Sequence, residues 1–442
     1  MPNKIANSIR KYLQDQKALT HKNYRLFLVG QSFSLIGTWI QRLAMIWLSY
    51  QLTGSAFLLG LVGFCEQIPI FVLAPFAGVF ADKWDKHKAL CRIEALAMIQ
   101  ALVLGILTLT GSVNIYHIII LSLCLGCINA FEVPIRQSFV VDMVDREKDV
   151  LPNAIATNSM VFNLSRLIGP SVAGILISSV GEGWCFMANA FSYAIVLTSL
   201  LCMHIQKFPA AVQSSEKVVK RLIEGIQYIK SKHIMRTLLI LLAIVSFSNA
   251  SLKTLAPIFA QDVLHGDAKT LGLLMSASGV GAIMGAIFLT NSKTTPLLSR
   301  IVSFTGLLLG VGMIFFALSR SVPLSLLFLA LTGLAQMMHT ACTNTLLQLH
   351  VSDDKRGRVM SFYTVCLQGT TPFGSLVAGA IAGVLGGPWA MAIMGIICIA
   401  ATLIFRHDKH AGDKDQKATL KNLNNPGLDE QNSSTTKQAA AV

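Results

Sequence analysis

The chain has 442 residues, of which 53% are hydrophobic and 13% are charged, and its mean hydropathy is +0.60. Soluble globular domains carry about 25% charged residues, so this composition excludes an ordinary soluble domain. The charges cluster between long apolar stretches, each close to the roughly 20 residues that a helix needs to cross a bilayer. We therefore expect an all-α membrane protein with several transmembrane helices.

Taken in chain order, residues 1–24 are polar and charged, which predicts a cytoplasmic tail and no cleavable signal peptide. Twelve apolar runs follow, at approximately Leu26–Leu52, Ser55–Ala81, Ala89–Thr110, Ile115–Pro134, Pro152–Val180, Trp184–His204, Thr237–Leu264, Leu271–Thr290, Ile301–Leu318, Pro323–Leu349, Val359–Gly386 and Pro388–Phe405. The runs lack the alternation of apolar and polar residues that is typical of outer-membrane barrel strands. They predict helices, which satisfy their backbone hydrogen bonds internally.

Lysine and arginine lie mainly in the loops on one side of the predicted spans. These loops contain Lys83, Lys86, Lys88, Arg92, Arg146, Lys148, the segment 206–236, Lys293, Arg300, Lys355, Arg356 and Arg358. The opposite side has only Lys269 and Arg320. The positive-inside rule therefore places both termini in the cytoplasm. The net charge of +14 then needs no nucleic-acid partner, because the basic residues face the anionic inner leaflet.

One long polar segment, residues 206–236, separates six runs from six. Its centre has apolar residues at helical spacing, which predicts an amphipathic helix along the inner membrane surface. We expect an N-terminal six-helix bundle over 25–205 and a C-terminal one over 237–406. The tail, 407–442, is rich in Lys, Asp, Asn and Ser, and we expect it to be disordered.

The two halves resemble repeats of one another. Arg42 follows Arg25 by 17 residues, and Lys253 follows Arg236 by the same interval. The stretch RLIGPSVAG (166–174) in the fifth run has a counterpart, TTPFGSLVAG (370–379), in the eleventh. Parallel six-span repeats are typical of one large transporter fold.

Five stretches resemble the major facilitator superfamily, and within it the transmembrane secretion effector family. They are GVFADKWDKHK (78–88), GTWIQRLAMIWLSYQLTGS, FEVPIRQSFVVDMV, LPNAIATNSMVFNLSRLIGPSVAGILI and VSDDKRGRVMSFYT. The resemblance extends over roughly residues 23–405. It implies twelve transmembrane helices in two pseudo-symmetric six-helix bundles. It also implies transport, because the family includes the enterobactin exporter and relatives of macrolide efflux pumps.

The loop after the second run carries the superfamily's loop motif, with Gly78, Asp82 and Lys83 at its positions. The resemblance implies that Asp82 meets Arg136 below the fourth span and faces the start of the eleventh span near Arg358. An anion at a helix N-terminus is stabilised by about 0.3–1 kcal/mol, so this contact would favour the state that is closed to the cytoplasm. The alternative is an ordinary charged loop that obeys the positive-inside rule.

The fifth run resembles the superfamily's antiporter motif, in which Gly-Pro and spaced glycines let helices approach across the two halves. Gly169, Pro170 and Gly174 match it; the upstream glycines are missing, and Arg166 stands close by. Small residues also pack transmembrane helices in general, so plain helix packing is the alternative.

Three ionisable residues fall at one depth in the membrane, and such residues are strong indicators of a functional site. Arg42, Glu66 and Lys253 lie 10 or 11 residues from the outer ends of their runs. At 1.5 Å per residue this is roughly 15–17 Å, near the midplane, where transporters of this kind bind substrate.

Arg42 and Glu66 belong to consecutive antiparallel spans and are predicted to pair. The pair has either a purely structural role or a role in coupling, in which Glu66 accepts a proton. Glu132, nearer the cytoplasm, is the second candidate for proton coupling. In the coupling hypothesis the proton gradient is the energy source, and we expect no cofactor.

Lys253 has no acid in its own span, and an unpaired lysine at this depth costs at least ~2.5 kcal/mol. The resemblance places the first and seventh spans on opposite sides of a central cavity, so Lys253 would face Arg42. Two cations and one carboxylate favour an anionic substrate. Gln41, Asn249 and His339 are candidates for hydrogen bonds to it, although each is equally interpretable as a residue that packs helices.

We therefore expect an exporter of an anionic small molecule such as a siderophore, driven by proton entry. The alternatives are efflux of drugs, for example macrolides, and movement of lysophospholipids. We expect no enzyme activity and no metal site, because no Ser/His/Asp set, metal cluster or nucleotide loop is visible. The expected partners are the substrate and the lipid bilayer, and we expect a monomer.

Overall fold

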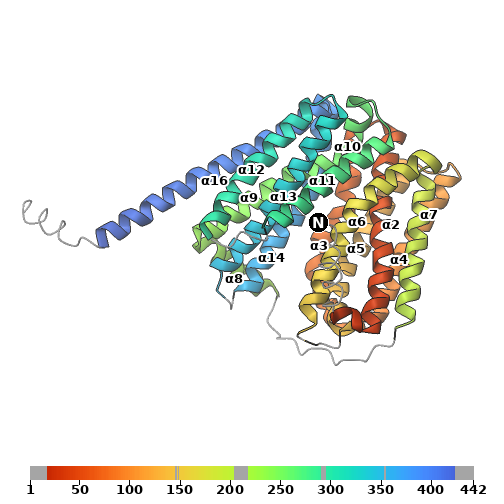
Figure 1. Ribbon diagram of the computed structural model, residues 1–442, viewed down its shortest axis with the longest axis horizontal. Helices are drawn as coiled ribbons and strands as arrows, with labels where there is room; N and C mark the ends of the chain where they lie inside the picture. Colours follow the sequence, from red (N-terminus) through yellow and green to blue (C-terminus); the bar gives the residue numbers. More distant parts are fainter. Residues whose placement is uncertain are drawn as a thin grey trace, which may run out of the picture.

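The computed structural model describes residues 17–144, 147, 149–203, 218–289, 295–352 and 355–423, except for the side chains of 17, 74–76, 78–83, 218–223, 295–296 and 408–423. The described residues form helices and include no strand. The helices are grouped in two bundles that lie side by side (Figure 1). This is the fold that the sequence predicts.

Each bundle contains six spans in chain order. The N-terminal bundle consists of α2 (Lys22–Thr53), α3 (Ala56–Lys83), α4 (Lys86–Leu109), α5 (Ile115–Met143), α6 (Leu151–Val180) and α7 (Glu182–Leu201), preceded by the short 3-10 helix η1 (Lys17–Thr20). The connecting segment contains α8 (Val218–Ser231). The C-terminal bundle consists of α9 (His233–Thr254), α10 (Ala256–Ile258), η2 (Phe259–Val263), α11 (Ala268–Leu289), α12 (Thr295–Leu318), α13 (Val322–His350), α14 (Arg356–Thr364), η3 (Val365–Gly369), α15 (Thr371–Leu385) and α16 (Gly387–Leu423).

Among the described residues, eleven helical stretches are long and apolar enough to cross a membrane. The twelfth predicted span is α2, which has 32 residues and is therefore long enough. It is more polar than the others because it contains buried Gln31 and Gln41 as well as Arg42. Its polar groups are directed toward neighbouring helices, and α2 packs against α6 and α7.

The predicted seventh and eleventh runs are interrupted in the structure. The seventh run is divided at Leu255 into α9 and α10, after which η2 has π-helical geometry. Pro257 explains the break, because proline has no N–H to donate to the carbonyl of Lys253 four residues earlier. The eleventh run contains the π-helical segment η3 between α14 and α15. Local π-helical turns occur frequently at functional sites.

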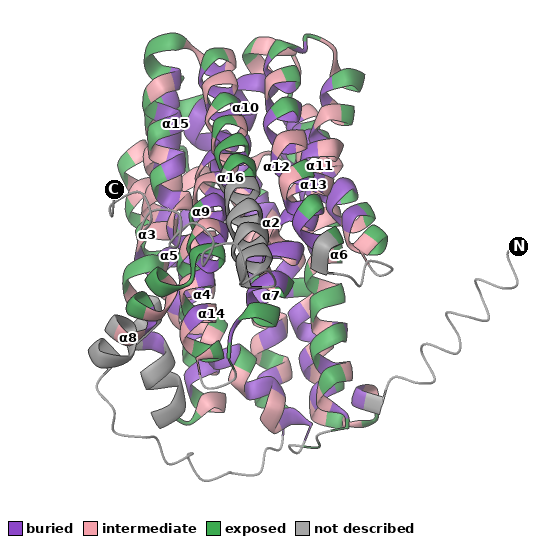
Figure 2. Cartoon of the chain, turned by 90° about the vertical axis from the view of Figure 1, so that its left-hand side faces the viewer, coloured by how far each residue is buried: buried purple, intermediate pink, exposed green. Residues whose placement is uncertain are grey.

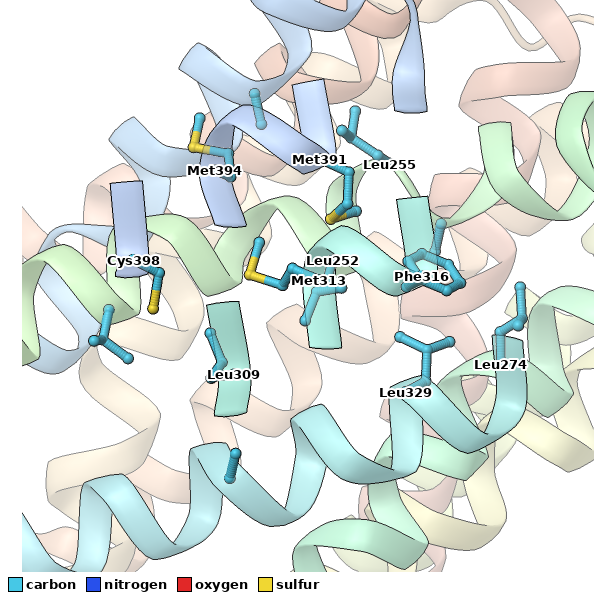
Figure 3. Packing of buried hydrophobic residues seen from close by; sticks show 14 of the residues in the cluster. Leu252, Leu255, Leu274, Leu309, Met313, Phe316, Leu329, Met391, Met394 and Cys398 are labelled. Atoms are coloured by element: carbon cyan, nitrogen blue, oxygen red, sulfur yellow. The ribbon is translucent and has the colours of Figure 1, made fainter. Parts of the chain in front are cut away.

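The largest of the hydrophobic clusters extends through both bundles. In its C-terminal part, Leu252 of α9 and Leu255, at the end of that helix, pack with Met313 and Phe316 of α12 and with Met391 of α16 (Figure 3). Figure 2, which colours the chain by burial, shows that buried and exposed residues alternate along the helices. Exposed apolar side chains are expected where a helix borders lipid.

The structure adds detail to two elements outside the spans. Helix α8, whose position along the membrane surface stays a prediction, packs against α9 and α14 of the C-terminal bundle. Its Glu224 forms an ion pair with Arg358 of α14. Helix α16 continues to Leu423, well beyond the last apolar residues near Phe405. Ala, Lys, Gln and Leu in this extension are good helix formers, which explains why the helix does not end where the hydrophobicity does. Residues 424–442 lie outside the described part.

The two bundles meet through glycines. A Cβ atom on Gly174 of α6 would lie 2.7 Å from the carbonyl oxygen of Ala268 and 3.2 Å from the Cα of Gly272 in α11. A Cβ atom on Gly379 of α15 would lie 2.8 Å from the Cα of Gly60 in α3. These two helix pairs, α6 with α11 and α3 with α15, therefore approach to backbone contact, which larger residues would prevent.

The same side of the molecule is closed by polar contacts. We call it the distal side, where α2 ends at Thr53; the linker side is the opposite one, where α8 lies. Tyr50 Oη donates a hydrogen bond to Asp262, and Gln51 Nε2 donates one to Gln261 Oε1 at 3.1 Å. The interval that relates Arg42 to Lys253 also relates Tyr50 to Gln261 and Gln51 to Asp262. The contact is thus reciprocal between the repeats, like an interface on a two-fold axis.

The bundles separate toward the linker side, where Figure 1 shows α8 and α14 apart from the ends of α2 and α6. The packed pairs of the two halves involve α6 with α11, α3 with α9, α15 and η3, and α10 with α2. The described conformation is therefore closed at the distal side.

We expect that cysteines at Gln51 and Gln261 form a disulfide under mild oxidation, because their side chains are in contact at the closed side. Cross-linking is measured by the change in gel mobility of the purified double variant. The matched control joins the linker-side ends of the same two helices, with cysteines at Lys22 and His233. Equal cross-linking of both pairs would contradict the described closure.

Candidate functional site

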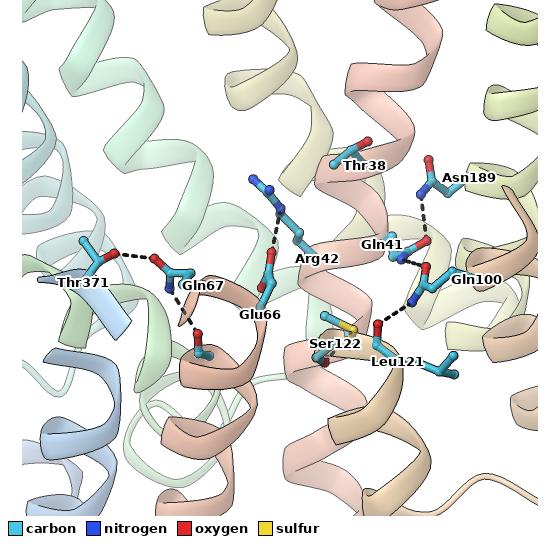
Figure 4. Close-up of polar contacts among 12 residues, drawn as sticks. Thr38, Gln41, Arg42, Glu66, Gln67, Gln100, Leu121, Ser122, Asn189 and Thr371 are labelled. Atoms are coloured by element: carbon cyan, nitrogen blue, oxygen red, sulfur yellow. Dashed lines mark hydrogen bonds and ion pairs between the residues drawn. The ribbon is translucent and has the colours of Figure 1, made fainter. Parts of the chain in front are cut away.

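The centre of the site is an ion pair between the first two spans. Arg42 Nε of α2 lies 3.1 Å from Glu66 Oε1 of α3 (Figure 4). The Arg42 side chain is 31% exposed and that of Glu66 is 11% exposed. The guanidinium carbon of Arg42 also lies 5.4 Å from the ring centroid of Trp39, which allows a cation–π interaction. Two opposite charges are therefore matched inside the N-terminal bundle.

Glycine at position 126 of α5 permits this arrangement. Any side chain at this position would collide with the carbonyl oxygen of Glu66 and with the ring of Pro69. Helix α5 therefore packs directly on the turn of α3 that carries the carboxylate. The close packing fixes the position of Glu66 relative to the neighbouring helices.

Lys253 lies opposite this pair, in the C-terminal bundle. It occupies the last turn of α9, where the helix dipole favours a positive charge. Its side chain is exposed, and its charged neighbours are Arg42, Glu66 and Arg166, all of the N-terminal bundle. Because these neighbours belong to the other half, the Lys253 side chain is directed toward the space between the bundles. Among the described residues, no carboxylate lies within 4.0 Å of it.

Arg166 of α6 is the residue that sequence reasoning did not include in the site. It is half-buried, and no ion pair or hydrogen bond joins its side chain to another described residue. A sequence signal was present: Arg166 is four residues before Pro170, as Lys253 is four residues before Pro257. In both cases the proline leaves the carbonyl of the basic residue without its usual helical donor.

Two of the predicted substrate contacts are enclosed within a bundle. Gln41 is 1% exposed; it donates to Gln100 Oε1 at 2.8 Å and accepts from Asn189 Nδ2 at 2.7 Å (Figure 4). His339 is fully buried, with Nδ1 3.2 Å from the carbonyl oxygen of Val302. In this conformation both residues join helices of one bundle.

Asn249, the remaining predicted contact, is half-buried in α9. It precedes Lys253 by four residues and so lies one turn away on the same face of the helix. Arg42, Glu66, Lys253 and Asn249 are thus the predicted residues that the structure brings toward the space between the bundles.

A second group of charges lies deeper in the N-terminal bundle. Glu132 of α5 pairs with Arg136, one turn later on the same helix, at 2.7 Å. Glu94 of α4, which the sequence analysis overlooked, is 2% exposed and has both residues as charged neighbours. Glu94 lies inside the third predicted run, Ala89–Thr110, and this position is the signal that could have identified it. Glu94 and Glu132 therefore both lie near Arg136, in a group of charges separate from Lys253.

The predicted gate is described only in part. The side chains of Gly78, Asp82 and Lys83 lie outside the described residues, so the contact of Asp82 with Arg136 stays a prediction. Arg358 pairs with Glu224 of α8 within its own half. The N-terminus of α14 is thus held by the linker helix in this conformation.

The predicted antiporter motif lies where α6 meets its neighbours. A Cβ atom on Gly169 would collide with the Cβ atom of Trp39 in α2, so Gly169 allows α2 and α6 to touch. The carbonyl oxygen of Pro170 lies against Gly272 of α11, in the other half. Ser171 and Ser276 are hydrogen-bonded between the same two helices, with their hydroxyl oxygens 2.7 Å apart. The motif therefore lies at contacts within the bundle and between the bundles.

Comparison with known families supports the fold and assigns the family. The model of the transmembrane secretion effector family matches residues 16–437, nearly the whole chain. The chain belongs to this family of the major facilitator superfamily. It is therefore a multi-pass membrane transporter.

The relatives of this chain include transporters of different molecules. The chain is 26% identical to the staphyloferrin A transporter of Staphylococcus aureus over 381 residues, covering 86% of this chain and 94% of the relative. It is 22% identical to macrolide efflux protein A of Streptococcus pyogenes, covering 84% of this chain and 92% of that protein. Both matches span most of the two chains.

Solved structures of transporters share the fold of the secretion effector. A bacterial homolog of the human lysosomal transporter Spinster, in an inward-facing and unoccupied conformation, superposes with a TM-score of 0.68. The two proteins are 14% identical, and the match covers 87% of this chain and 96% of the other. The nucleoside transporter NupG superposes with a TM-score of 0.64 at 14% identity, covering 88% of this chain and 98% of that one.

We expect that the effects of Arg42→Gln and Glu66→Gln on the free energy of unfolding are not additive. The coupling free energy should be about 0.5–3 kcal/mol, as is usual for residues of one charge network. Each single substitution leaves the other charge without its partner, whereas the double substitution removes both. The free energy of unfolding in detergent is measured for the four proteins of the cycle. In the control cycle, the substitution Arg300→Gln takes the place of Arg42→Gln. Arg300 is an exposed residue of α12. Additive effects in the first cycle would show that the pair does not stabilise the fold.

Proposed function

We propose that this protein is a secondary active exporter that moves an anionic small molecule across the membrane by alternating access. The observation that carries the proposal is the placement of Lys253 opposite Arg42 and Glu66, with its side chain directed toward the other half. A cation at this depth is costly unless an opposite charge or water stabilises it. An anionic substrate supplies that charge when it binds.

The proposed substrate class is the siderophores with acidic groups. The positive charge of the site supports this, and so does the relative whose name gives staphyloferrin A as its cargo. The alternative is efflux of drugs, which the names of the multidrug pump Tap and of macrolide efflux protein A support. A positively charged site disfavours the binding of lipophilic cations. A neutral drug would not need a positively charged site.

We further propose that the linker side faces the cytoplasm of a bacterial inner membrane, with both termini there. The concentration of lysine and arginine in the loops of that side supports this orientation. The described conformation, closed at the distal side, is then open to the cytoplasm. The superposition on a transporter solved in an inward-facing conformation agrees with that assignment.

Proton entry is the proposed energy source, with Glu66 as the coupling group. A proton on Glu66 removes its negative charge and so weakens its attraction for Arg42. Arg42 can pair either with ionised Glu66 or with the anionic substrate, and this competition for one guanidinium links the proton to the substrate. Glu132 remains the second candidate for proton coupling. It pairs with Arg136, and a proton on Glu132 would weaken that ion pair in the same way.

If Lys253 contacts the anion, Lys253→Ala should weaken binding about tenfold to a hundredfold, because one charge-assisted hydrogen bond is lost. Lys253→Arg should keep part of the affinity, since the charge survives and the geometry changes. Staphyloferrin A and a macrolide serve as probes in a binding assay on purified protein, with Arg300→Ala as the control.

Thermal stability of the same variants distinguishes two roles of Lys253: a contact to the substrate, and a structural role in which it neutralises Glu66. A substrate contact predicts an unchanged or raised melting temperature for Lys253→Ala, because an unpaired charge is removed. Full affinity for staphyloferrin A together with a lowered melting temperature would refute the contact. Loss of macrolide binding alone would favour the drug-efflux alternative.

If Glu66 carries the proton, Glu66→Gln should abolish export driven by a pH gradient in proteoliposomes while binding persists. The amide keeps the size of the side chain and cannot accept the proton. Exchange of substrate without a gradient is the control and should continue. Gradient-driven export at the wild-type rate would leave Glu66 as a structural partner of Arg42 only.

A further inference from the structure

Two cations of the site lack a counterion among the described residues, and they belong to different halves. Arg166 is on α6 of the N-terminal bundle and Lys253 is on α9 of the C-terminal bundle. Of the charged groups around Lys253, Arg166 has the strongest influence, ahead of Arg42 and Glu66. The two cations therefore lie near each other across the boundary between the bundles.

Neighbouring contacts fix the direction of Arg166 on α6. Phe162, one turn before it, packs edge-on against Trp39 at 6.3 Å between ring centroids. Gly169, one turn after it, lies against the same tryptophan. Residues three and four apart share one face of a helix, so Arg166 lies on the face that α6 turns toward Trp39. Trp39 in turn lies under the guanidinium of Arg42, which places Arg166 at the site.

The charges of the site do not balance. The ion pair between Arg42 and Glu66 is neutral as a unit. Arg166 and Lys253 remain, with two positive charges that repel each other in a region of low dielectric constant. A single negative group would compensate only one of them.

We propose that the substrate carries two separate anionic groups, one bound by Arg166 and the other by Lys253. This inference rests on the proposed function and specifies it: the ligand is at least a dianion, such as a dicarboxylate, and not merely an acid. Arg166 is well suited to a carboxylate, because its guanidinium offers two parallel N–H donors. Lys253 offers a compact charge to the second group.

Such a ligand also acts on the conformation. Without it, the repulsion between Arg166 and Lys253 opposes the approach of the two bundles around the site. With it, each bundle is attracted to one end of the same molecule. A dianion therefore favours closure of the linker side around it, whereas a monoanion can neutralise only one bundle.

The test uses the purified full-length protein and the linear dicarboxylates from malonate to suberate, which vary the distance between the two charges. Their half methyl esters provide monoanions of the same carbon skeleton, and the dimethyl esters provide neutral molecules. Binding is measured by calorimetry for the wild type, Arg166→Gln, Arg166→Lys and Lys253→Gln. Arg300→Gln is the matched control, since it makes the same chemical change at an exposed arginine of α12.

For the wild type we expect at least one dicarboxylate to bind about tenfold to a hundredfold more tightly than its half ester. Arg166→Gln and Lys253→Gln should each abolish that preference, while Arg166→Lys keeps part of it and Arg300→Gln keeps all of it. The melting temperature of ligand-free Arg166→Gln should be unchanged or higher, because a repulsion is removed.

Two results overturn the proposal in different ways. The first is equal binding of dicarboxylates and half esters by the wild type, or an intact preference for dicarboxylates in Arg166→Gln. Either outcome shows that an anion binds but that Arg166 does not bind a second anionic group. Wild-type protein that binds none of the acids better than the neutral diesters overturns the proposed anion transport as well.

Discussion

A charged side chain near the middle of a bilayer needs an opposite charge or water, because hydrocarbon offers neither. Much of this structure follows from that requirement. Arg42 meets it with Glu66, and Arg136 meets it with Glu132. Lys253 and Arg166 do not meet it with any described residue, and they lie where the two bundles face each other. The unmet requirement is the basis of the proposed anionic substrate.

The small residues between the bundles are the second constraint, because they allow one side to close. Backbone contact at Gly174 with α11 and at Gly60 with α15 brings the halves together at the distal side. Polar side chains at the ends of α2 and η2 then complete the closure. On the linker side the described helices separate, and α8 is held to the C-terminal bundle by the pairing of Glu224 with Arg358. The site between the bundles is therefore accessible from one side.

The sequence was sufficient for the fold and for part of the site. Hydropathy predicts the spans, and depth along the runs brings Arg42, Glu66 and Lys253 to one level. Depth alone does not give the direction of a side chain, so Gln41 and His339 were placed at the site although each joins helices within one bundle. Glu94 and Arg166 were missed for the same reason, since only tertiary packing shows which face of their helices meets a neighbour. The breaks at Leu255 and η3 depend on backbone hydrogen bonds that hydropathy does not report.

The distal contact between Tyr50, Gln51, Gln261 and Asp262 sets the scale of the conformational equilibrium. Its two hydrogen bonds are at least partly exposed to solvent, so together they contribute about 1–3 kcal/mol net. A free energy of this size changes the ratio of closed to open molecules by about 5- to 150-fold. Such a contact biases the distal side toward closure without locking it. A ligand that binds the opposite state more tightly by a similar factor is enough to reverse the population.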